Sequence, residues 1–390
     1  MIPVAAVTKP FGAACNLDCA YCYFLSKEAL HPDKPQVMDE ALLRQYLVNY
    51  LRSNPDGPVF IHWQGGEPTL RGLEFYQLAQ AITDEFARPG QQVQHTIQTN
   101  ATLVDAEWAD FFASKGWLVG VSIDGPAELH NAYRVNRAGR GSFDQVMRGW
   151  RILQDAGVDV NVLCTVNSAN VGAPLEVYRF FRDTLGAKFL QFIPIVERVE
   201  AGQEDLAERS WRGEDGTHVV YRQRGTAVTS RTVAPEAWGN FLCAVFDEWL
   251  VRDVGEVFVQ HFDGMLGARL GKYTTCVHAP ECGTNLEVDP SGMAYACDHF
   301  VESGYALGNV AAMDLSEMVQ LPRQVRFGRS KLTELSAKCV SCPVRWACHG
   351  GCLKDRFTGE DGRLNYLCAG YYRFFCHAAP AIESMARKIR

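Results

Sequence analysis

Three cysteines near the start of the chain constrain its fold and chemistry more than any other feature. Cys15, Cys19 and Cys22 are separated by three and two residues, so one short loop can present all three thiolates to the same metal group. Thiolate is the ligand of iron-sulfur clusters, and this set would hold three irons of a cubane. The remaining iron would have no protein ligand and could bind a small molecule as a chelate. The spacing therefore indicates a catalytic cluster rather than simple electron storage.

A zinc knuckle or scattered buried cysteines would also explain a thiol-rich loop. Zinc usually takes a further Cys or His close by, and none lies near Cys22. The other cysteines also cluster, between 276 and 297 and between 339 and 368, with Cys164, Cys243 and Cys376 standing apart. Disulfides are not expected in a reducing compartment, so the clustering favours metal sites.

The overall composition restricts the class of protein. A chain of 390 residues, 47% hydrophobic and 21% charged, can form one large domain and a smaller one. Its formal net charge of -7 argues against a nucleic-acid binder, which normally carries a basic patch. No apolar run reaches the length of a membrane span, and residues 1–4 lack the basic start and long apolar core of a signal peptide. We therefore expect a cytoplasmic protein that binds neither membranes nor nucleic acid.

Strand-like apolar runs alternate with amphipathic helical segments through the first half of the chain. The expected strands are 4–9, 59–64, 93–98, 118–123, 158–166 and 189–194, and the expected helices lie near 39–53, 73–87, 105–114, 143–156 and 175–185. Such crossovers imply parallel pairing. A closed eight-stranded barrel would need two more units.

Polar residues follow several of these strands, at the edge where parallel α/β folds bind ligands. Gly65 and Gly66 follow the second strand and would let the backbone approach a ligand closely, although paired glycines also form simple turns. Gln98, Asn100 and Ser122 end the next two strands. Such side chains suit hydrogen bonds to a ribose or a carboxylate, and Asn100, like Asp124, also suits a helix cap or turn. Arg134 could pair with a ligand carboxylate or lie on the surface.

Residues 196–235 are polar and only weakly periodic, and we expect an excursion between two domains. Its charged residues, which include Glu197, Arg198, Glu200, Glu204, Asp205, Glu208, Arg209 and Arg212, are expected to form a solvated face. A loop over the barrel mouth that helps to hold substrate is the alternative.

The two later clusters together contain eight cysteines, enough for two four-cysteine sites: Cys276, Cys282, Cys297, Cys339, Cys342, Cys348, Cys352 and Cys368. Residues 285–296 predict a hairpin turning at 290–292, which would carry Cys297 back toward the first two cysteines. Two zinc ribbons would use the same number of thiolates, so spacing alone does not name the metal. Asp298 follows one of these cysteines and could cap a turn or act as a general base.

The cysteine loop, with Tyr21 before its last cysteine, resembles the signature of radical S-adenosylmethionine (SAM) enzymes. The run WQGGEP at 63–68 looks like the GGEP motif of that family. The eight-cysteine region resembles the SPASM extension of radical SAM enzymes that modify peptides. Over nearly the whole chain, the sequence is most similar to anaerobic sulfatase-maturating enzymes, on residues 9–10, 63–75, 124–126, 190–193 and the extension. The longer 196–235 segment departs from that pattern.

This resemblance implies an α/β fold, a partial (β/α)6 TIM-like radical SAM barrel over 1–235, including the connecting excursion 196–235, and a cysteine-rich SPASM domain over 236–390. It implies three 4Fe-4S clusters. Their ligands would be Cys15, Cys19 and Cys22 for the SAM cluster, Cys276, Cys282, Cys297 and Cys352 for the first auxiliary cluster, and Cys339, Cys342, Cys348 and Cys368 for the second. The implied SAM contacts are Tyr21, Gly65, Gly66, Glu67, Gln98, Asn100, Ser122 and Arg134. Tyr23, Phe24 and Gln191 are expected to line a peptide channel, with packing in the core as the alternative for the aromatic residues.

The implied activity oxidises a Cys or Ser of a sulfatase to Cα-formylglycine. A 5'-deoxyadenosyl radical would take hydrogen from the substrate Cβ, Asp298 would accept the thiol or hydroxyl proton, and an auxiliary cluster would accept an electron. The implied partners are an unfolded or nascent sulfatase polypeptide and an electron donor such as flavodoxin or ferredoxin. The alternatives are a SPASM enzyme that crosslinks or epimerises a ribosomal peptide, and a non-catalytic iron-sulfur electron carrier or zinc scaffold.

Overall fold

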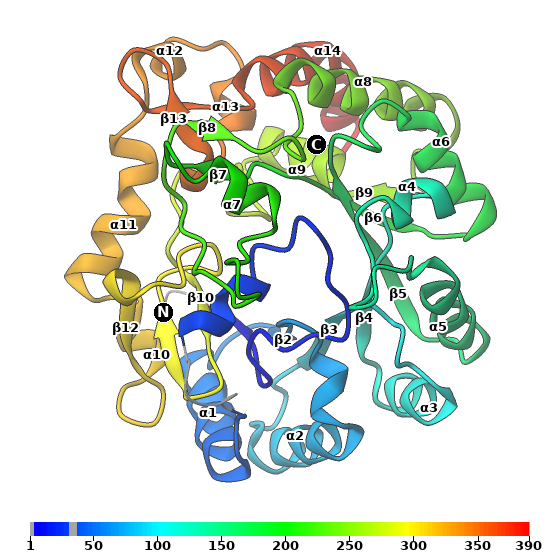
Figure 1. The fold of residues 1–390 in the computed structure, drawn as a ribbon, viewed down its shortest axis with the longest axis vertical. Coiled ribbons are helices and arrows are strands. Elements are labelled where there is room, and N and C mark those ends of the chain that lie inside the picture. Colours follow the sequence, from blue (N-terminus) through cyan, green and yellow to red (C-terminus); the bar gives the residue numbers. More distant parts are fainter. Residues whose placement is uncertain (1–3, 31–36, 390) are drawn as a thin grey trace.

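A curved sheet of ten strands lies at the centre of this computed structural model, which describes residues 4–30 and 37–389. Its strand order is β12-β11-β10-β1-β2-β3-β4-β5-β6-β9. Neighbouring strands from β1 to β6 are all parallel, as predicted. Their bounds are β1 Ala5–Thr8, β2 Val59–Trp63, β3 Val93–Thr99, β4 Leu118–Ser122, β5 Asp159–Val166 and β6 Phe189–Pro194. Figure 1 shows helices around the outside of the curve and the N-terminal loop inside it.

Side-chain alternation explains how each strand separates the core from the inside of the curve. In β2, Val59, Ile61 and Trp63 are buried against the helices. Phe60 and His62, at the alternate positions, are more exposed. The same alternation along β3 to β6 leaves polar side chains such as Gln98 inside the curve.

The predicted helices of the first half are present and begin and end for local reasons. They are α1 Glu40–Ser53, α2 Leu73–Phe86, α3 Ala106–Lys115, α5 Phe143–Asp155 and α6 Pro174–Arg179, which a π-helical turn over Phe180–Thr184 continues. A short helix that was not predicted, α4 Ala127–Asn131, lies between β4 and α5. Asp39 and Asp105 cap the first turns of α1 and α3 by accepting from backbone amides. Gly116 ends α3 in the left-handed conformation that glycine tolerates. None of the helices in the described part of the chain is long and apolar enough to span a membrane.

Strands from the second half extend both edges of the sheet. Strand β9 (Phe258–Val259) pairs in parallel with β6, and β10 (Asn285–Val288) pairs in parallel with β1. The predicted hairpin is confirmed, because β10 is antiparallel to β11 (Met293–Tyr295). One hydrophobic core includes residues from both halves, so the domain boundary at 235/236 stays a prediction.

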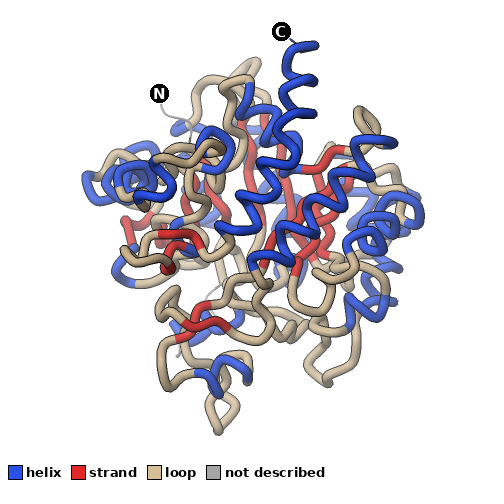
Figure 2. The backbone as a smooth tube through the Cα atoms, turned by 90° about the horizontal axis from the view of Figure 1, so that it is seen from above, coloured by secondary structure: helices blue, strands red, loops and turns tan. Residues whose placement is uncertain are grey.

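The other elements of the second half surround these strands. They are α8 Pro235–Arg252, α9 Gln260–Arg269, β12 Ala306–Asn309, α10 Leu315–Met318, α11 Pro322–Thr333, α12 Ala337–Val340, α13 Arg345–Cys348, β13 Arg356–Thr358, β14 Leu364–Asn365 and α14 Cys368–Ile389. Figure 2 shows long loops gathered on one side of the strands and the C-terminal helix on the other.

The 196–235 excursion has a small core of its own, formed by Val199, Ala207, Trp211 and Tyr221. Its elements are β7 Arg198–Val199, α7 Glu204–Glu208 and β8 Ala227–Val228. The expectation of a solvated charged face is wrong for Glu197, which is 4% exposed and pairs with Arg231 at 2.9 Å. Periodicity could not reveal this pair, because its partners lie 34 residues apart.

Candidate active site

The cysteine loop and the carboxyl ends of the parallel strands enclose a cavity of about 270 Å3. Among the residues expected to bind SAM, cluster or substrate, those lining it are Cys15, Cys19, Tyr21, Cys22, Tyr23, Phe24, Gly65, Gly66, Gln98, Asn100, Ser122, Arg134 and Asp298. Glu67 and Gln191 are not among its lining residues. The structure thus gathers residues from most of the chain around one space.

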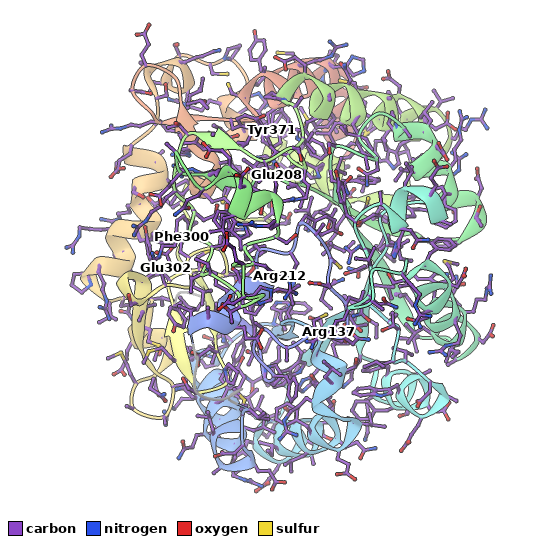
Figure 3. The ribbon with its side chains drawn as sticks, in the orientation of Figure 1. Arg137, Glu208, Arg212, Phe300, Glu302 and Tyr371 are labelled. Atoms are coloured by element: carbon purple, nitrogen blue, oxygen red, sulfur yellow. The ribbon has the colours of Figure 1, made fainter. Side chains whose placement is uncertain are left out.

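The cysteine loop is fixed from several sides. Arg137 donates from Nε and Nη2 to the carbonyl oxygen of Cys15, over 3.1 and 2.8 Å. Arg212, from the excursion, pairs with Asp18 at 2.7 Å. Figure 3 labels both arginines. The loop that carries the thiols is therefore held in place by the folded protein itself.

The three thiols of this loop share a buried environment. Burial raises the pKa of Cys19 to about 12, and it also raises the pKa values of Cys15 and Cys22. Such thiols stay protonated unless a metal replaces the proton. Their mutual proximity and their position at the cavity wall fit a metal cluster.

The two glycines after β2 are required by backbone packing. A Cβ on Gly66 would lie 2.1 Å from the carbonyl oxygen of Ala14, and one on Gly65 would lie 2.9 Å from that of Gly12. The Gly66 amide also donates to Gly12 over 2.9 Å. The glycines thus let the loop after β2 pack directly on the cysteine loop.

Glu67 links two strand ends and lies behind the cavity. Its carboxylate accepts from the Thr69 amide at 3.0 Å, the Thr99 hydroxyl at 2.6 Å and the Asn100 amide at 2.8 Å. Burial raises the pKa of Glu67, whereas these hydrogen bonds oppose the rise. Glu67 therefore positions Asn100, which does line the cavity.

Polar side chains on β3 and β4 form a second wall. Gln98 donates to the Ser122 hydroxyl over 2.9 Å. A Cβ on Gly120 would lie 2.1 Å from the Gln98 side-chain oxygen, so glycine on β4 makes the room for this amide. Asn100 donates to Asn16 of the cysteine loop over 2.9 Å.

Arg134 is buried, so a surface position for it is wrong. It pairs with Asp124 at 2.9 Å and lies over the ring of Tyr21. Asp124 accepts from the Tyr21 hydroxyl and from the Thr165 amide. The sequence alone suggested a cap or turn for Asp124. The run DGP at 124–126, which carries part of the family resemblance, was the one sign that Asp124 belongs to the site.

Asp298 also lines the cavity. Its carboxylate contacts the Lys9 ammonium at 2.5 Å and accepts from the Tyr23 hydroxyl at 2.6 Å. Burial alone would raise the pKa of Asp298, but Lys9 and the hydrogen bonds lower it to about 2. Lys9 is 1% exposed and its ammonium lies 3.6 Å from the centre of the Phe24 ring. Sequence reasoning gave Lys9 no role in the site, although it noted residues 9–10.

The excursion supplies part of the cavity wall, as the alternative expectation proposed. Glu197, Tyr221 and Gln223 line the cavity. Lys27, next to the cysteine loop, donates to the carbonyl oxygen of Tyr221 over 2.6 Å. His299 and Lys354 also line the cavity and were not predicted.

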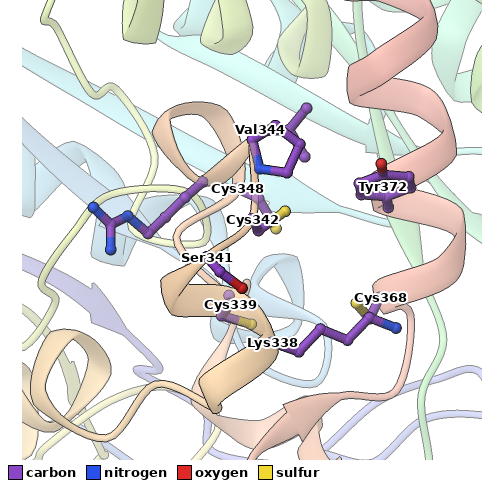
Figure 4. Close-up of a pocket in the computed structure, with 11 residues that line it drawn as sticks. Lys338, Cys339, Ser341, Cys342, Val344, Cys348, Cys368 and Tyr372 are labelled. Atoms are coloured by element: carbon purple, nitrogen blue, oxygen red, sulfur yellow. The ribbon is translucent and has the colours of Figure 1, made fainter.

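The eight clustered cysteines of the second half form two groups. Cys339, Cys342, Cys348 and Cys368, here called the second auxiliary set, line a cavity of about 240 Å3 (Figure 4). The first auxiliary set comprises Cys276, Cys282, Cys297 and Cys352. Within it, burial raises the pKa of Cys297, and the nearby charges of Cys352 and Cys276 raise it further. The charge of Cys276 likewise adds to the rise in the pKa of Cys282 that burial causes.

Burial raises the pKa values of Cys348 and Cys352 to about 12. Among residues 4–30 and 37–389, no three Cys, His, Asp or Glu side chains are placed to hold a single metal ion.

Comparison with known proteins gives consistent matches. The radical SAM superfamily model matches residues 10–179, and the SPASM model, an iron-sulfur cluster-binding domain, matches residues 276–343. A serine-type anaerobic sulfatase-maturating enzyme of Bacteroides thetaiotaomicron is 41% identical, over 99% of this chain and 92% of its own. A cysteine-type anaerobic sulfatase-maturating enzyme of Clostridium perfringens is 29% identical over 100% of both chains. A solved structure of native anSMEcpe with bound AdoMet and Cp18Cys peptide has a TM-score of 0.85 and 29% identity, covering 100% of both chains.

Proposed function

This chain belongs to the anaerobic sulfatase-maturating enzymes of the radical SAM superfamily, and from that premise we propose that it oxidises a Cys or Ser of a sulfatase polypeptide to Cα-formylglycine. The observation that carries the proposal is one cavity lined both by the three-cysteine loop and by Asp298. Enzymes of this superfamily require SAM and a 4Fe-4S cluster, and the SPASM domain binds additional clusters.

Cys15, Cys19 and Cys22 would hold the first cluster. SAM bound there would supply the 5'-deoxyadenosyl radical that takes hydrogen from the substrate Cβ. The residues of this chain would orient both molecules. Gln98 and Ser122 can bind hydroxyl groups from one wall, and Arg134, kept charged by Asp124, can face a carboxylate.

Asp298 would accept the proton from the substrate thiol or hydroxyl. Its low pKa keeps the carboxylate ionised. Loss of hydrogen from Cβ makes the adjacent O–H or S–H much more acidic, so a weakly basic carboxylate suffices. Lys9 and Tyr23 hold the carboxylate in one orientation, which favours proton transfer at that stage.

One hydrogen atom, one proton and one electron together complete the oxidation of a hydroxyl to an aldehyde, or of a thiol to a thioaldehyde that water then hydrolyses. The first auxiliary set would hold a cluster able to take one electron, and it adjoins the proton acceptor because Cys297 precedes Asp298. Tyr23 and Phe24 would contact the peptide, together with Tyr221 and Gln223 of the excursion, which line the same cavity.

We also propose that an electron-transfer protein such as flavodoxin or ferredoxin reduces the enzyme near the second auxiliary set. The cavity lining there includes Lys338 and Arg345 and no acidic side chain. Tyr372 on its rim and the adjacent Val340 are exposed. An apolar surface with positive charge suits a small acidic protein.

The test is mass spectrometry of sulfatase-derived peptides with Ser or Cys at the modified position, incubated without oxygen with reconstituted enzyme, SAM and reductant. An aldehyde product together with 5'-deoxyadenosine is expected, and Asp298→Asn is expected to lose the aldehyde about 100-fold or more while still cleaving SAM. SAM cleavage by the unaltered enzyme without an aldehyde on either peptide would overturn the assigned substrate and direct the search to other peptides.

A further inference from the structure

One face of α11 packs against the first auxiliary set. Gln324, Gly328 and Lys331 are the buried residues of this helix and recur at helical spacing. Gln324 donates to the carbonyl oxygens of Gly283 and Ala296, over 2.9 and 3.0 Å. A Cβ on Gly328 would lie 2.2 Å from the Cys282 carbonyl oxygen, so glycine permits this approach. The helix is thereby fixed to the loops that carry Cys282 and Cys297.

Lys331 ends this face with a buried positive charge. It is 1% exposed, and Nζ donates to the carbonyl oxygens of Cys276, Val277 and Ala279. Three acceptors match the three N–H groups of an ammonium, whereas a neutral amine has only two. The geometry therefore holds a cation at the backbone of the first auxiliary set.

Arg356 places a second cation between the two auxiliary sets. Its guanidinium donates to the carbonyl oxygens of Gly350 at 3.0 Å, Lys331 at 2.8 Å and His349 at 2.7 Å. Its charge acts on thiols of both sets, namely Cys339, Cys352, Cys348 and Cys282.

Neither cation has a carboxylate partner: the ion pairs formed within the described ranges include neither Lys331 nor Arg356. Buried charges of this kind are costly unless an opposite charge is near. A cubane with four thiolate ligands is a net anion, because the thiolates outweigh the positive charge of its core. Such a group in each auxiliary set would supply the missing negative charge.

We propose that Lys331 and Arg356 are the counter-charges of the auxiliary clusters, and that Lys331 raises the reduction potential of the cluster in the first set. Gaining one electron makes a cluster more negative, so a fixed cation beside it favours the reduced form. Cys297 of this set precedes Asp298, so a cluster held there would be placed to accept the electron that leaves the substrate as its proton passes to the carboxylate. The charge of Lys331 would thus favour electron acceptance by that cluster. The inference rests on the part of the proposed function that assigns clusters to the auxiliary sets. It does not depend on the identity of the peptide substrate.

The experiment uses the full chain with Cys15, Cys19 and Cys22 replaced by Ala, so that only the auxiliary sets hold iron. Midpoint potentials are measured by redox titration followed by electron paramagnetic resonance. Lys331→Gln removes the charge at similar length, Lys331→Arg keeps it, and Lys115→Gln removes an exposed charge on α3. We expect a lower potential for one cluster in Lys331→Gln, and wild-type potentials in Lys331→Arg and Lys115→Gln.

Full iron content with unchanged potentials in Lys331→Gln would overturn the proposal. If Lys331→Gln loses iron, the iron content of Lys331→Arg distinguishes the two explanations. Retained iron in Lys331→Arg supports a requirement for positive charge. Equal loss of iron shows that the shape of lysine is needed and overturns the proposal. These outcomes are distinguishable from failure of the proposed function. A protein with both auxiliary clusters that forms no aldehyde would contradict only the assigned substrate.

Discussion

Three buried cations near the active-site cavity and two beside the auxiliary cysteine sets have different kinds of partner. Around the cavity, Lys9, Arg134 and Arg231 each contact a carboxylate of the protein. Beside the auxiliary sets, the hydrogen bonds that Lys331 and Arg356 form with the described residues all go to backbone carbonyls. The cavity is therefore assembled before it binds anything, whereas the auxiliary region depends on the groups that it holds.

Removal of iron should show this difference most strongly. Without clusters, the loops over residues 276–282 and 337–352 are no longer joined through bound iron, and the charges of Lys331 and Arg356 are no longer neutralised. We expect amide hydrogen exchange there to be faster by an order of magnitude or more in the iron-free protein, with little change at the ends of β2 and β3. Equal changes in both regions would contradict the comparison.

Loss of the carboxylate partner in the cavity should be the next largest effect. Asp124→Asn leaves Arg134 buried without its counter-charge and is expected to lower the free energy of unfolding by about 3 to 5 kcal/mol. Urea unfolding of the iron-free protein measures this, beside the exposed Asp110→Asn. A loss of less than about 1 kcal/mol, typical of a surface ion pair, would show that the pair is not essential to the cavity.

The packing of the cysteine loop offers a more local test. Gly66→Ala would force the loop after β2 away from Ala14, at a cost of about 1 to 3 kcal/mol. We expect Gly66→Ala to lose only the iron of the first cluster. Its iron content should therefore match that of a variant that lacks Cys15, Cys19 and Cys22. Gly172→Ala is the control, because a Cβ there meets no atom within 4 Å. Full iron content in Gly66→Ala would disprove the packing argument.

Lys9→Gln should separate proton transfer from radical formation. The glutamine can keep one hydrogen bond but not the charge that orients Asp298, so aldehyde formation is expected to fall about 10-fold to 100-fold, as for loss of a charged hydrogen bond. SAM cleavage without peptide should change much less, which chromatography of 5'-deoxyadenosine measures. Parallel loss of both activities would instead assign Lys9 to the SAM site.

The smallest effect is expected at the exposed rim of the second auxiliary set. Lys338→Glu should weaken binding of an acidic flavodoxin by roughly threefold to fivefold at low salt, because exposed ion pairs contribute up to about 1 kcal/mol. Calorimetric titration at two salt concentrations measures this, with Lys388→Glu as the matched surface control. Equal weakening in both variants would exclude a specific docking surface there.

Sequence patterns predicted the elements whose cause is local. The apolar strand runs, the helical periodicity between them and the spacing of the first three cysteines depend on neighbouring residues, and the parallel sheet followed from the alternation of strands and helices. The division of the eight auxiliary cysteines into two cluster sites came from family resemblance and not from spacing.

The missed features depend on contacts between distant residues. Tyr23 and Asp298 lie 275 positions apart, and a lysine before the cysteine loop gives no sign of the carboxylate it will meet. Glu67 illustrates a different limit. The motif marks it as important, but only the structure shows that its carboxylate holds strand ends together behind the cavity.

The position of β1 has a consequence for biosynthesis. This strand lies between β2 and β10, although β10 is synthesised more than two hundred residues later. During translation, β1 to β6 can pair as they leave the ribosome, while the β10 edge of β1 stays open. Asp298, which follows the β10–β11 hairpin, reaches the cysteine loop only when that edge closes. The cysteine loop thus acquires its proton acceptor at a late stage of chain synthesis.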